Sequence, residues 1–226
     1  MIPKKINNSI IMKYLWILAI SVASLTSVFA QREVAAVGEI STNNELSASG
    51  DMNVQKDVLI LLAHPNMAAS KANAAMIEAV KDYPFVRIIN IYEAPFEAAT
   101  YTAAFREAKH IVFQFPFYWA SAPHLLKKWC DEIFGAIMAD PGVKGKTLTV
   151  ATTTGSEYEA YRSGGRNLFT IDELLRPYQV LAHHSGMVWQ TPFVIYGTSL
   201  PDADKRIKEG ATAYRGKMNS IRNNEK

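Results

Sequence analysis

The sequence has little cysteine, little concentrated charge and no glycine-rich nucleotide motif, and each deficit excludes a class of protein. A single cysteine, Cys130, allows neither an internal disulfide nor a cysteine-rich metal site. The formal net charge is +3 and the basic residues are scattered, so we expect no nucleic-acid partner. Neither a Walker A motif nor G-x-G-x-x-G occurs, so a nucleoside triphosphate site and a Rossmann dinucleotide site have no support.

What is present is the composition of an ordinary globular protein. Of the 226 residues, 49% are hydrophobic and 20% are charged, which favours a packed core over disorder. Setting an N-terminal segment aside leaves roughly 170 residues, the length of one domain.

The N-terminus resembles a secretory signal. Lys13 precedes an apolar run over residues 14–25, and Val28 and Ala30 stand where a signal peptidase reads small residues. Alternatively, the run is a membrane anchor, although its serines weaken it as a bilayer span. We predict a signal peptide or membrane anchor at 1–30, a flexible linker at 31–56 and a folded domain at 57–226.

From residue 57 onward, short apolar runs alternate with helical periodicity, which is typical of βαβ units around a parallel sheet. The first run is continuously apolar, as in a strand that helices cover on both faces. We predict strands at 58–63, 86–92, 110–115, 147–152 and 186–196. We predict helices at 71–81, 101–108, 123–134, 171–178 and 202–221. The expected fold class is α/β, a three-layer sandwich with a five-stranded parallel sheet.

Ligands of an open α/β sheet bind beyond the carboxyl ends of its strands, where three loops qualify here. The first, residues 64–73, opens a helix whose first N–H groups lack partners, and a phosphate would suit it. Alternatively, Ser70 is an N-cap and His64 is a turn residue whose hydrogen bonds are satisfied.

The second loop, residues 115–123, places Phe117, Tyr118 and Trp119 between two prolines, the first of them Pro116. Aromatic faces and rigid backbone amides can hold a flat heteroaromatic ring. Alternatively, these aromatic side chains fill the core beneath the loop.

The third loop, residues 152–165, begins with a run of hydroxyl groups and continues with two tyrosines, Tyr158 and Tyr161. The hydroxyl and N–H groups of its first residues can bind a ligand, or they bond only their own backbone. The residues concerned are Thr152, Thr153, Thr154 and Gly155.

Together these segments resemble one family. They are Ala63-His64-Pro65 with Ser70 and Asn73, then Phe115-Pro-Phe-Tyr-Trp119 with the helix from Pro123 to Phe134, then Thr152-Thr-Thr-Gly155. The chain is identified from them as similar to the flavodoxin-like NAD(P)H dehydrogenases (quinone). That family includes DT-diaphorase, bacterial modulator-of-drug-activity proteins and the ancillary oxidoreductases of glutathione-gated potassium efflux systems.

The resemblance implies a flavodoxin-like fold and non-covalently bound FMN, or FAD, with NAD(P)H as co-substrate. The phosphate would lie at His64, Ser70 and Asn73. The flavin ring would lie on Pro116, Phe117, Tyr118 and Trp119, with Thr152, Thr153, Thr154 and Gly155 near its pyrimidine edge. The resemblance also implies that hydride would pass from NAD(P)H to the flavin and that a quinone would then take two electrons in a ping-pong cycle. Tyr158 or Tyr161 would hydrogen-bond the acceptor oxygen.

One departure from the family concerns the third loop. DT-diaphorase pairs a loop tyrosine with a nearby histidine, whereas this loop carries Arg162 and Arg166 and no histidine. Arg166 is an alternative charge stabiliser or a contact for the phosphate of NADPH, or else a solvated surface arginine. The pair His183 and His184 has no partners at ligand spacing, so we predict no metal site.

Two further functions compete with catalysis. The resemblance to efflux-system proteins suggests a flavin-binding regulatory subunit of a membrane transport system, and a third reading is a small electron carrier like flavodoxin. A homodimer is expected from the family. The N-terminal signal predicts an exported or periplasmic protein, which is membrane-tethered if the segment is retained and cytoplasmic if it is not used. A protein exported unfolded would have to obtain FMN and NAD(P)H outside the cytoplasm, which conflicts with this prediction. No twin-arginine pair precedes the apolar run to indicate export of the folded protein.

We expect residues up to about Ala30 to be removed or to hold the protein at the membrane. The full chain would be expressed in a bacterium, and mass spectrometry would identify its N-terminus in the cytosolic, membrane and exported fractions. Leu18→Arg, which interrupts the apolar run, should leave the protein uncleaved in the cytosol. An intact N-terminus on cytosolic wild-type protein would contradict the prediction.

Overall fold

The computed structural model describes residues 55–223. The predicted signal segment and almost all of the predicted linker therefore lie outside the described residues. Within the described residues, no helix combines the length and the apolar character needed to cross a membrane.

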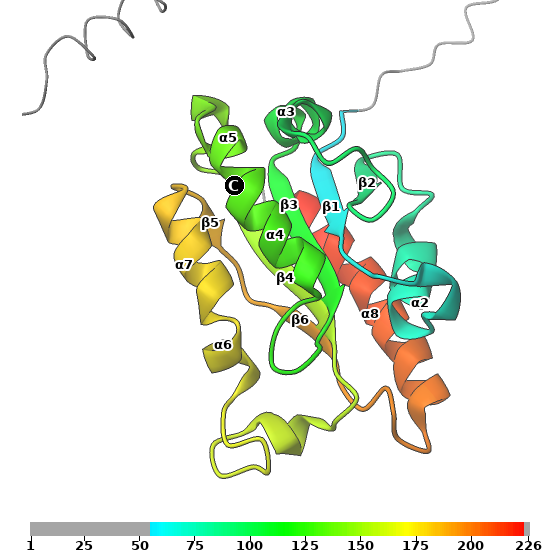
Figure 1. Cartoon of the computed structure of the whole chain (residues 1–226). Coiled ribbons are helices and arrows are strands. Elements are labelled where there is room, and N and C mark those ends of the chain that lie inside the picture. Colours follow the sequence, from blue (N-terminus) through cyan, green and yellow to red (C-terminus); the bar gives the residue numbers. More distant parts are fainter. Residues whose placement is uncertain (1–54, 224–226) are drawn as a thin grey trace, which may run out of the picture. The chain divides into compact units, whose positions relative to one another are not determined.

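One parallel sheet forms the centre of the described domain (Figure 1). Its strands run in the order β2-β1-β3-β4-β5, and β6 also pairs with β4. Their bounds are β1 Val58–Leu62, β2 Val86–Asn90, β3 His110–Pro116, β4 Thr147–Thr153, β5 Val188–Trp189 and β6 Phe193–Ile195. This strand order is that of flavodoxin-like sheets.

The predicted fifth strand, residues 186–196, is wrong as a single strand because it is broken into β5 and β6. Thr147 of β4 pairs with Val188, whereas Thr153 pairs with Ile195, so the second piece is shifted by one residue. Pro192 lies in the break and has no N–H to donate to a ladder. The extra residue and the proline together interrupt the strand.

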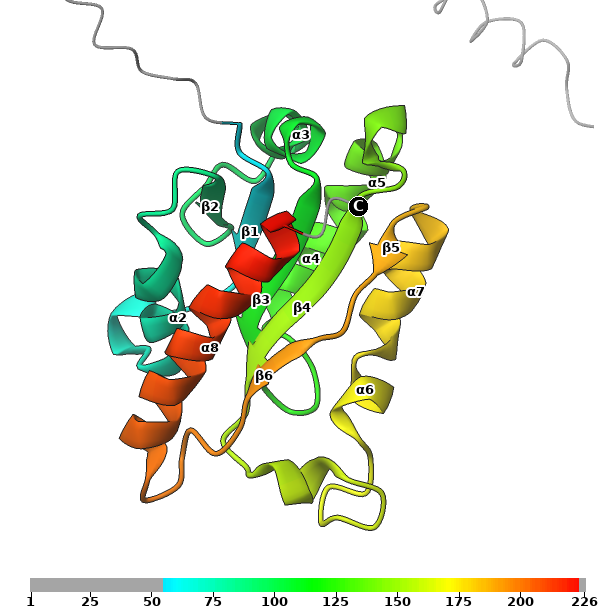
Figure 2. The same cartoon turned by 180° about the vertical axis from the view of Figure 1, so that it is seen from behind.

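Helices cover both faces of the sheet, which confirms the three-layer prediction (Figures 1 and 2). On one face lie α2 Ala72–Val80 and α8 Ala203–Asn223. On the other lie α3 Ala98–Glu107, α4 His124–Glu132, α5 Phe134–Met138, α6 Ile171–Leu174 and α7 Arg176–His184. Short 3-10 turns complete the described chain: η1 Met67–Ala69, η2 Pro141–Val143 and η3 Tyr158–Tyr161.

Two helices that the sequence predicted as continuous are each divided. The predicted helix at 123–134 is α4 followed by α5, which meet at Ile133. The predicted helix at 171–178 is α6 followed by α7, and α7 extends to His184. Pro177 explains the second division, because it lies in the first turn of α7 and cannot donate a hydrogen bond back into α6.

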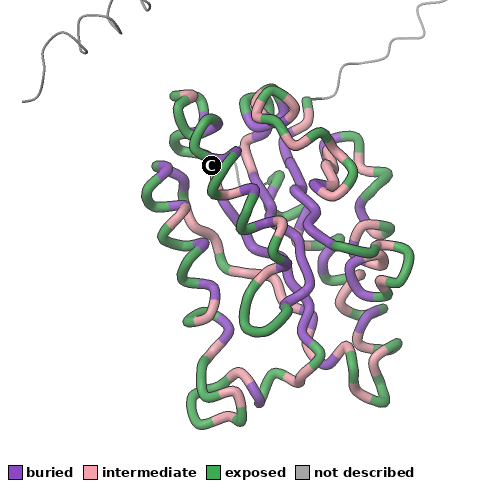
Figure 3. The backbone as a smooth tube through the Cα atoms, in the orientation of Figure 1, coloured by how far each residue is buried: buried purple, intermediate pink, exposed green. Residues whose placement is uncertain are grey.

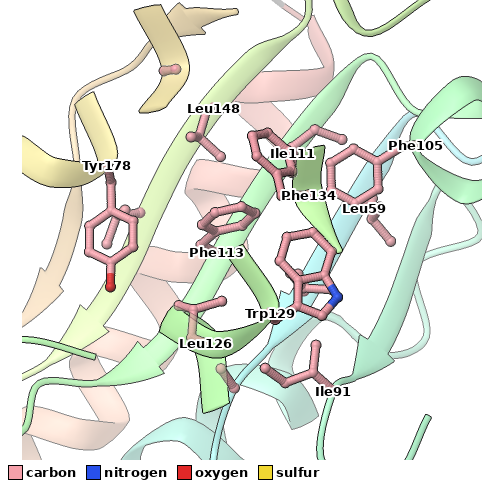
Figure 4. Close-up of a cluster of buried hydrophobic side chains, with 14 of the residues drawn as sticks. Leu59, Ile91, Phe105, Ile111, Phe113, Leu126, Trp129, Phe134, Leu148 and Tyr178 are labelled. Atoms are coloured by element: carbon pink, nitrogen blue, oxygen red, sulfur yellow. The ribbon is translucent and has the colours of Figure 1, made fainter. Parts of the chain in front are cut away.

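Alternating side chains of β1 fill two cores. Val58 and Ile60 pack with α2 and α8, while Leu59 and Leu61 pack with α3 and α4. Trp129 of α4 is completely buried at the centre of the second core, where its ring lies 5.9 Å from that of Phe105 at an interplanar angle of 23° (Figure 4). Figure 3 shows buried strands between helices that are exposed along part of their length.

A glycine allows α8 to approach the sheet. A Cβ atom on Gly210 would lie 2.6 Å from Cδ1 of Ile195 in β6, closer than two carbon atoms can pack. Any larger residue would therefore require the Ile195 side chain or α8 itself to shift.

A buried polar network connects the two helices of this layer with the sheet. The Tyr214 hydroxyl of α8 donates to Oε1 of Gln114 at 3.0 Å. The Gln114 side-chain amide donates to the backbone carbonyl of Asn73 at 3.2 Å and to its Oδ1 at 3.3 Å. Asn73 Nδ2 in turn donates to Thr153 Oγ1 at 3.1 Å. The network thus joins α8, β3, α2 and β4.

Removing the hydroxyl at the end of this network should destabilise the fold. Tyr214→Phe leaves Oε1 of the buried Gln114 without its donor, and we expect a loss of about 1–3 kcal/mol in the free energy of unfolding. Tyr83→Phe is the matched control, because the Tyr83 hydroxyl accepts an exposed hydrogen bond from Asn219, and its cost should stay below about 0.5 kcal/mol. Urea unfolding measures both, and equal losses would contradict the role of the network.

Candidate functional site

The loops that follow β1, β3, β4 and β6 meet at the carboxyl edge of the sheet, at the lower end of Figure 1. They enclose a cavity of about 430 Å³. We call it the α2 cavity because α2 begins in its wall. It is lined by His64, Ala69, Ser70, Lys71, Ala72, Asn73, Pro116, Phe117, Tyr118, Thr153, Gly155, Thr198, Ser199 and Ile207. Most of the residues predicted to bind a cofactor are thereby brought together.

Helix α2 begins at this cavity without a side-chain cap. Its N-cap residue is Lys71, and no cap hydrogen bond forms there. Ser70 is not the N-cap, and its own N–H donates to the carbonyl of Met67 at 3.1 Å. The first N–H groups of the helix, its positive dipole end and the Lys71 ammonium give this wall a positive potential. Such a wall suits a phosphate.

The Lys71 ammonium is only weakly engaged elsewhere. It lies 3.5 Å from Oδ1 of Asp204, and both side chains are more than three-quarters exposed. An exposed pair at this distance contributes little. Lys71 was not among the residues that the sequence predicted for the site.

His64 is both a turn residue and a wall residue. Its Nδ1 accepts a hydrogen bond from the N–H of Asn66 at 3.1 Å, as expected for a satisfied turn residue. Burial lowers the pKa of His64 below its ordinary value, which favours the neutral ring. With Nδ1 accepting, the proton of that neutral ring lies on Nε2.

The hydroxyl loop after β4 serves mainly to hold the structure together. Thr152 Oγ1 donates to the carbonyl of Phe115 at 2.7 Å, and Thr154 Oγ1 donates to the carbonyl of Ser156 at 2.8 Å. Neither residue lines the α2 cavity. Thr153 and Gly155 do line it, although the Thr153 hydroxyl already accepts a hydrogen bond from Asn73.

A fourth loop, which the sequence prediction missed, closes the α2 cavity. Thr198 and Ser199 follow β6, and their N–H groups donate to the carbonyls of Thr154 and Gly155 at 2.9 and 3.3 Å. Ile207 of α8 completes the wall. The same rule that selected the other loops applies here, because the chain also leaves the carboxyl end of the last strand at this point.

A second cavity, of about 430 Å³, shares Phe117 with the first. We call it the aromatic cavity. Its other lining residues are Trp119, Ala120, Ser156, Tyr161, Asn167, Phe169 and Leu174. Phe117 is 8% exposed and belongs to the core beneath the loop. Trp119 is fully exposed, so the alternative that these aromatics fill the core does not hold for it.

The exposure of Trp119 results from a strained turn. Tyr118 and Ser121 exchange backbone hydrogen bonds of 2.8 and 2.9 Å. Between them, Trp119 and Ala120 have φ angles of 48° and 60°. Both lie in the left-handed region, as in a type I′ turn, where glycine and asparagine are favoured. Backbone strain of this kind is concentrated at functional sites.

The two predicted catalytic tyrosines occupy different positions in η3. Tyr161 lines the aromatic cavity, and its ring centroid lies 6.0 Å from that of Phe117. Tyr158 is 51% exposed and lies edge-on to Tyr196 at 5.3 Å. Both tyrosines line a third cavity, of about 260 Å³, which we call the tyrosine cavity. Its other lining residues are Arg162, Ser163, Thr170, Ile171, Asp172 and Tyr196.

Burial keeps the inner tyrosines protonated. Desolvation raises the pKa of Tyr161 above its ordinary value and raises that of Tyr196 to about 12. Both hydroxyls are therefore hydrogen-bond donors at neutral pH.

Neither Cys130 nor the possible metal-ligating side chains of residues 55–223 form a second reactive site. Burial raises the pKa of the Cys130 thiol to about 12, so it is not a thiolate nucleophile. Within residues 55–223, no cluster of three or more histidine, cysteine, aspartate or glutamate side chains is arranged to hold a metal.

The strand order and the cavities at the carboxyl edge define the class of this protein, an α/β protein with a flavodoxin-like sheet and a phosphate-suited site. A sequence profile of the flavodoxin-like fold matches residues 56–218. The chain therefore belongs to the flavodoxin-like family, which confirms the resemblance drawn from its motifs.

Relatives of the chain carry oxidoreductase and efflux-system names. The uncharacterized NAD(P)H oxidoreductase YdeQ of Bacillus subtilis (strain 168) is 38% identical over 176 residues, which cover 74% of this chain and 89% of that protein. The glutathione-regulated potassium-efflux system ancillary protein KefG of Serratia proteamaculans (strain 568) is 32% identical over 177 residues, 72% of this chain and 93% of that protein. The first of these names supports an oxidoreductase.

Solved structures agree with this assignment. The NADPH-quinone reductase from P. pentosaceus has a TM-score of 0.62 at 27% identity, covering 71% of this chain and 96% of that one. General stress protein 14 from Treponema denticola, solved in complex with FMN, has a TM-score of 0.66 and covers 73% of this chain and 99% of that one. At 24% identity, the second likeness shows the fold alone.

The strained turn predicts an unusual response to glycine. Ala120→Gly should raise the free energy of unfolding by up to about 1 kcal/mol, because glycine adopts a φ of 60° without strain. The same change at Ala213, an exposed position inside α8, should lower it by about 1 kcal/mol. Urea unfolding of both variants tests the opposite signs. A loss of stability in Ala120→Gly as large as that in Ala213→Gly would show that the turn is not strained.

Proposed function

We propose that this protein is a flavin-dependent NAD(P)H oxidoreductase that binds FMN and reduces quinones or similar acceptors. The observation that carries the proposal is the junction of two cavities at Phe117. One cavity has a wall suited to a phosphate, and the other has aromatic walls suited to a flat ring. FMN combines these two groups in one molecule.

The phosphate of FMN would lie at the start of α2. Its acceptor oxygens match the N–H groups of the uncapped first turn, and its charge matches the Lys71 ammonium. The side chains of Asn73 and Thr153 are committed to the buried network, so they hold α2 in place while backbone groups face the ligand. His64 adds an Nε2–H donor to the same wall.

The ring of FMN would lie against the loop after β3, where Phe117 and Trp119 line the aromatic cavity. When bound, FMN supplies the redox chemistry, taking a hydride from NAD(P)H and passing two electrons to the acceptor. The protein's own contribution is to orient the reactants, to exclude water with apolar walls and to place hydrogen-bond donors.

Tyr161 is the proposed donor to the acceptor oxygen. It lines the aromatic cavity beside Phe117, and its raised pKa keeps the hydroxyl protonated throughout the neutral range. Tyr158 faces the tyrosine cavity and does not line the aromatic one. Of the two tyrosines predicted from the sequence, Tyr161 therefore has the better position for the catalytic role.

The absorbance spectrum of purified protein reconstituted with FMN tests the function. Anaerobic NADPH should bleach the flavin band, and menadione should restore it. Protein that retains no flavin, or retains flavin that neither NADPH nor NADH bleaches, would refute the oxidoreductase proposal.

A tyrosine-to-phenylalanine pair tests the catalytic donor. Tyr161→Phe should lower kcat/KM for the quinone by about 10-fold, the equivalent of one hydrogen bond of about 1.4 kcal/mol. Tyr158→Phe, the matched control, should change that value by less than about 2-fold. Stopped-flow measurement of flavin reoxidation isolates this half of the cycle, and equal effects of the two variants would exclude a special role for Tyr161.

A second candidate function is the regulation of a membrane transporter, which the similarity to KefG favours. The exposed apolar side chains of Trp119 and Phe169, which line the aromatic cavity, and of Leu168, the residue before Phe169, offer a surface for a partner or for a second copy in a homodimer. A protein that binds FMN but oxidises NAD(P)H no faster than free FMN would favour regulation. Sedimentation velocity would show whether the chain is a dimer.

We also propose a cellular location for the protein. The N-terminal segment supports an exported or membrane-tethered protein, and the fractionation experiment described above decides this.

A further inference from the structure

The tyrosine cavity is built from aromatic rings and one arginine. Tyr158 and Tyr196 lie edge to face at 5.3 Å, and Tyr161 lies 6.0 Å from Tyr196. The guanidinium carbon of Arg162 lies 5.7 Å from the centre of the Tyr158 ring. The cavity thus combines flat aromatic rings with the positive charge of Arg162 and the negative charge of Asp172.

Arg162 forms no ion pair with another side chain of residues 55–223, although the Asp172 carboxylate lines the same cavity. Arg166, which the sequence offered as a phosphate contact, is paired with Glu157 at 3.0 Å. The arginine charge available to an anion in this cavity is therefore that of Arg162, four residues before the arginine that the sequence analysis named as one alternative phosphate contact.

The loop that carries Arg162 is held by its own backbone. The N–H of Gly165 donates to the carbonyl of Arg162 at 2.8 Å, and that of Asn167 donates to the carbonyl of Ala160 at 3.1 Å. A Cβ atom on Gly165 would lie 2.4 Å from the carbonyl oxygen of Glu159, so only glycine fits this close approach. Arg162 is consequently presented from a fixed loop, which lowers the ordering cost of binding.

The tyrosine cavity adjoins the proposed redox site. Tyr161 lines both the tyrosine cavity and the aromatic cavity. At about 260 Å³, the tyrosine cavity is smaller than the roughly 300–1,000 Å³ of a site that encloses a whole small-molecule ligand. Its size suits one end of a longer ligand whose other end reacts in the aromatic cavity.

We propose that the tyrosine cavity binds the adenosine 2′-phosphate end of NADPH and that Arg162 makes the protein favour NADPH over NADH. The proposal rests on the oxidoreductase function proposed above. The planar guanidinium binds phosphate oxygens in a bidentate manner, and the tyrosine faces contact the adenine ring. The Asp172 carboxylate accepts hydrogen bonds from the ribose hydroxyl or the adenine amino group. NADH lacks the 2′-phosphate, so this contact with Arg162 adds nothing to its binding affinity.

Steady-state and direct binding measurements test the proposal on the full chain. In the FMN-loaded protein, Arg162→Gln should lower kcat/KM for NADPH by about 10- to 100-fold, the effect of losing charged hydrogen bonds. Its kcat/KM for NADH should change by less than about 2-fold. Arg162→Lys keeps the charge but loses the bidentate geometry, and its effect should be intermediate. Arg166→Gln is the matched control and should leave the NADPH/NADH ratio unchanged.

Calorimetric titration separates this proposal from the redox function, because it needs no turnover. Adenosine 2′,5′-bisphosphate should bind the wild type more tightly than adenosine 5′-monophosphate does, and Arg162→Gln should remove that difference. Binding with this pattern in a protein that reduces no flavin would support the nucleotide site and refute the oxidoreductase function. Equal binding of the two nucleotides, a wild-type preference for NADH, or a ratio unchanged by Arg162→Gln would overturn the proposal.

Discussion

Gln114 is the polar residue on which the geometry of the site depends. It is completely buried in β3, between two phenylalanines, and it must be hydrogen-bonded to remain there. Its partners are Tyr214 on α8 and Asn73 on α2, and Asn73 continues to Thr153 on β4. A network in a low-dielectric interior permits few alternative arrangements. It therefore fixes the start of α2, and with it the positive wall of the α2 cavity, relative to the ends of β3 and β4.

Much of the architecture could be predicted because it depends on local patterns. Continuous apolar runs gave β1 and β3, and helical periodicity gave α2 and α8 close to their observed bounds. The break at Pro192 and the division at Pro177 were missed because apolar residues resume directly after each proline. In each case proline lacks the N–H that a continuous strand or helix would need, so the element is interrupted although the apolar residues continue beyond it.

The position of the site could be predicted, because the direction of the strands determines which loops meet. The hydrogen-bond partners within the site were harder to predict, because several side chains compete for the same groups. The rule for carboxyl ends of strands located the α2 cavity, and it would have located Thr198 and Ser199 had it been applied to the last strand. It could not show that Thr152 and Thr154 bond the backbone. Nor could it show that Glu157 pairs with Arg166, or that Arg162 has no ion pair within residues 55–223. Those outcomes depend on which of several nearby groups the folded chain brings within hydrogen-bonding distance.

The interrupted strand at the edge of the sheet has a consequence for aggregation. An unbroken edge strand presents a row of free N–H and C=O groups that can recruit a strand from another molecule. Here the edge consists of two short pieces with a register shift and Pro192 between them. A neighbouring chain could not add a continuous strand along it, so fibril-like growth from this edge is blocked by the backbone itself.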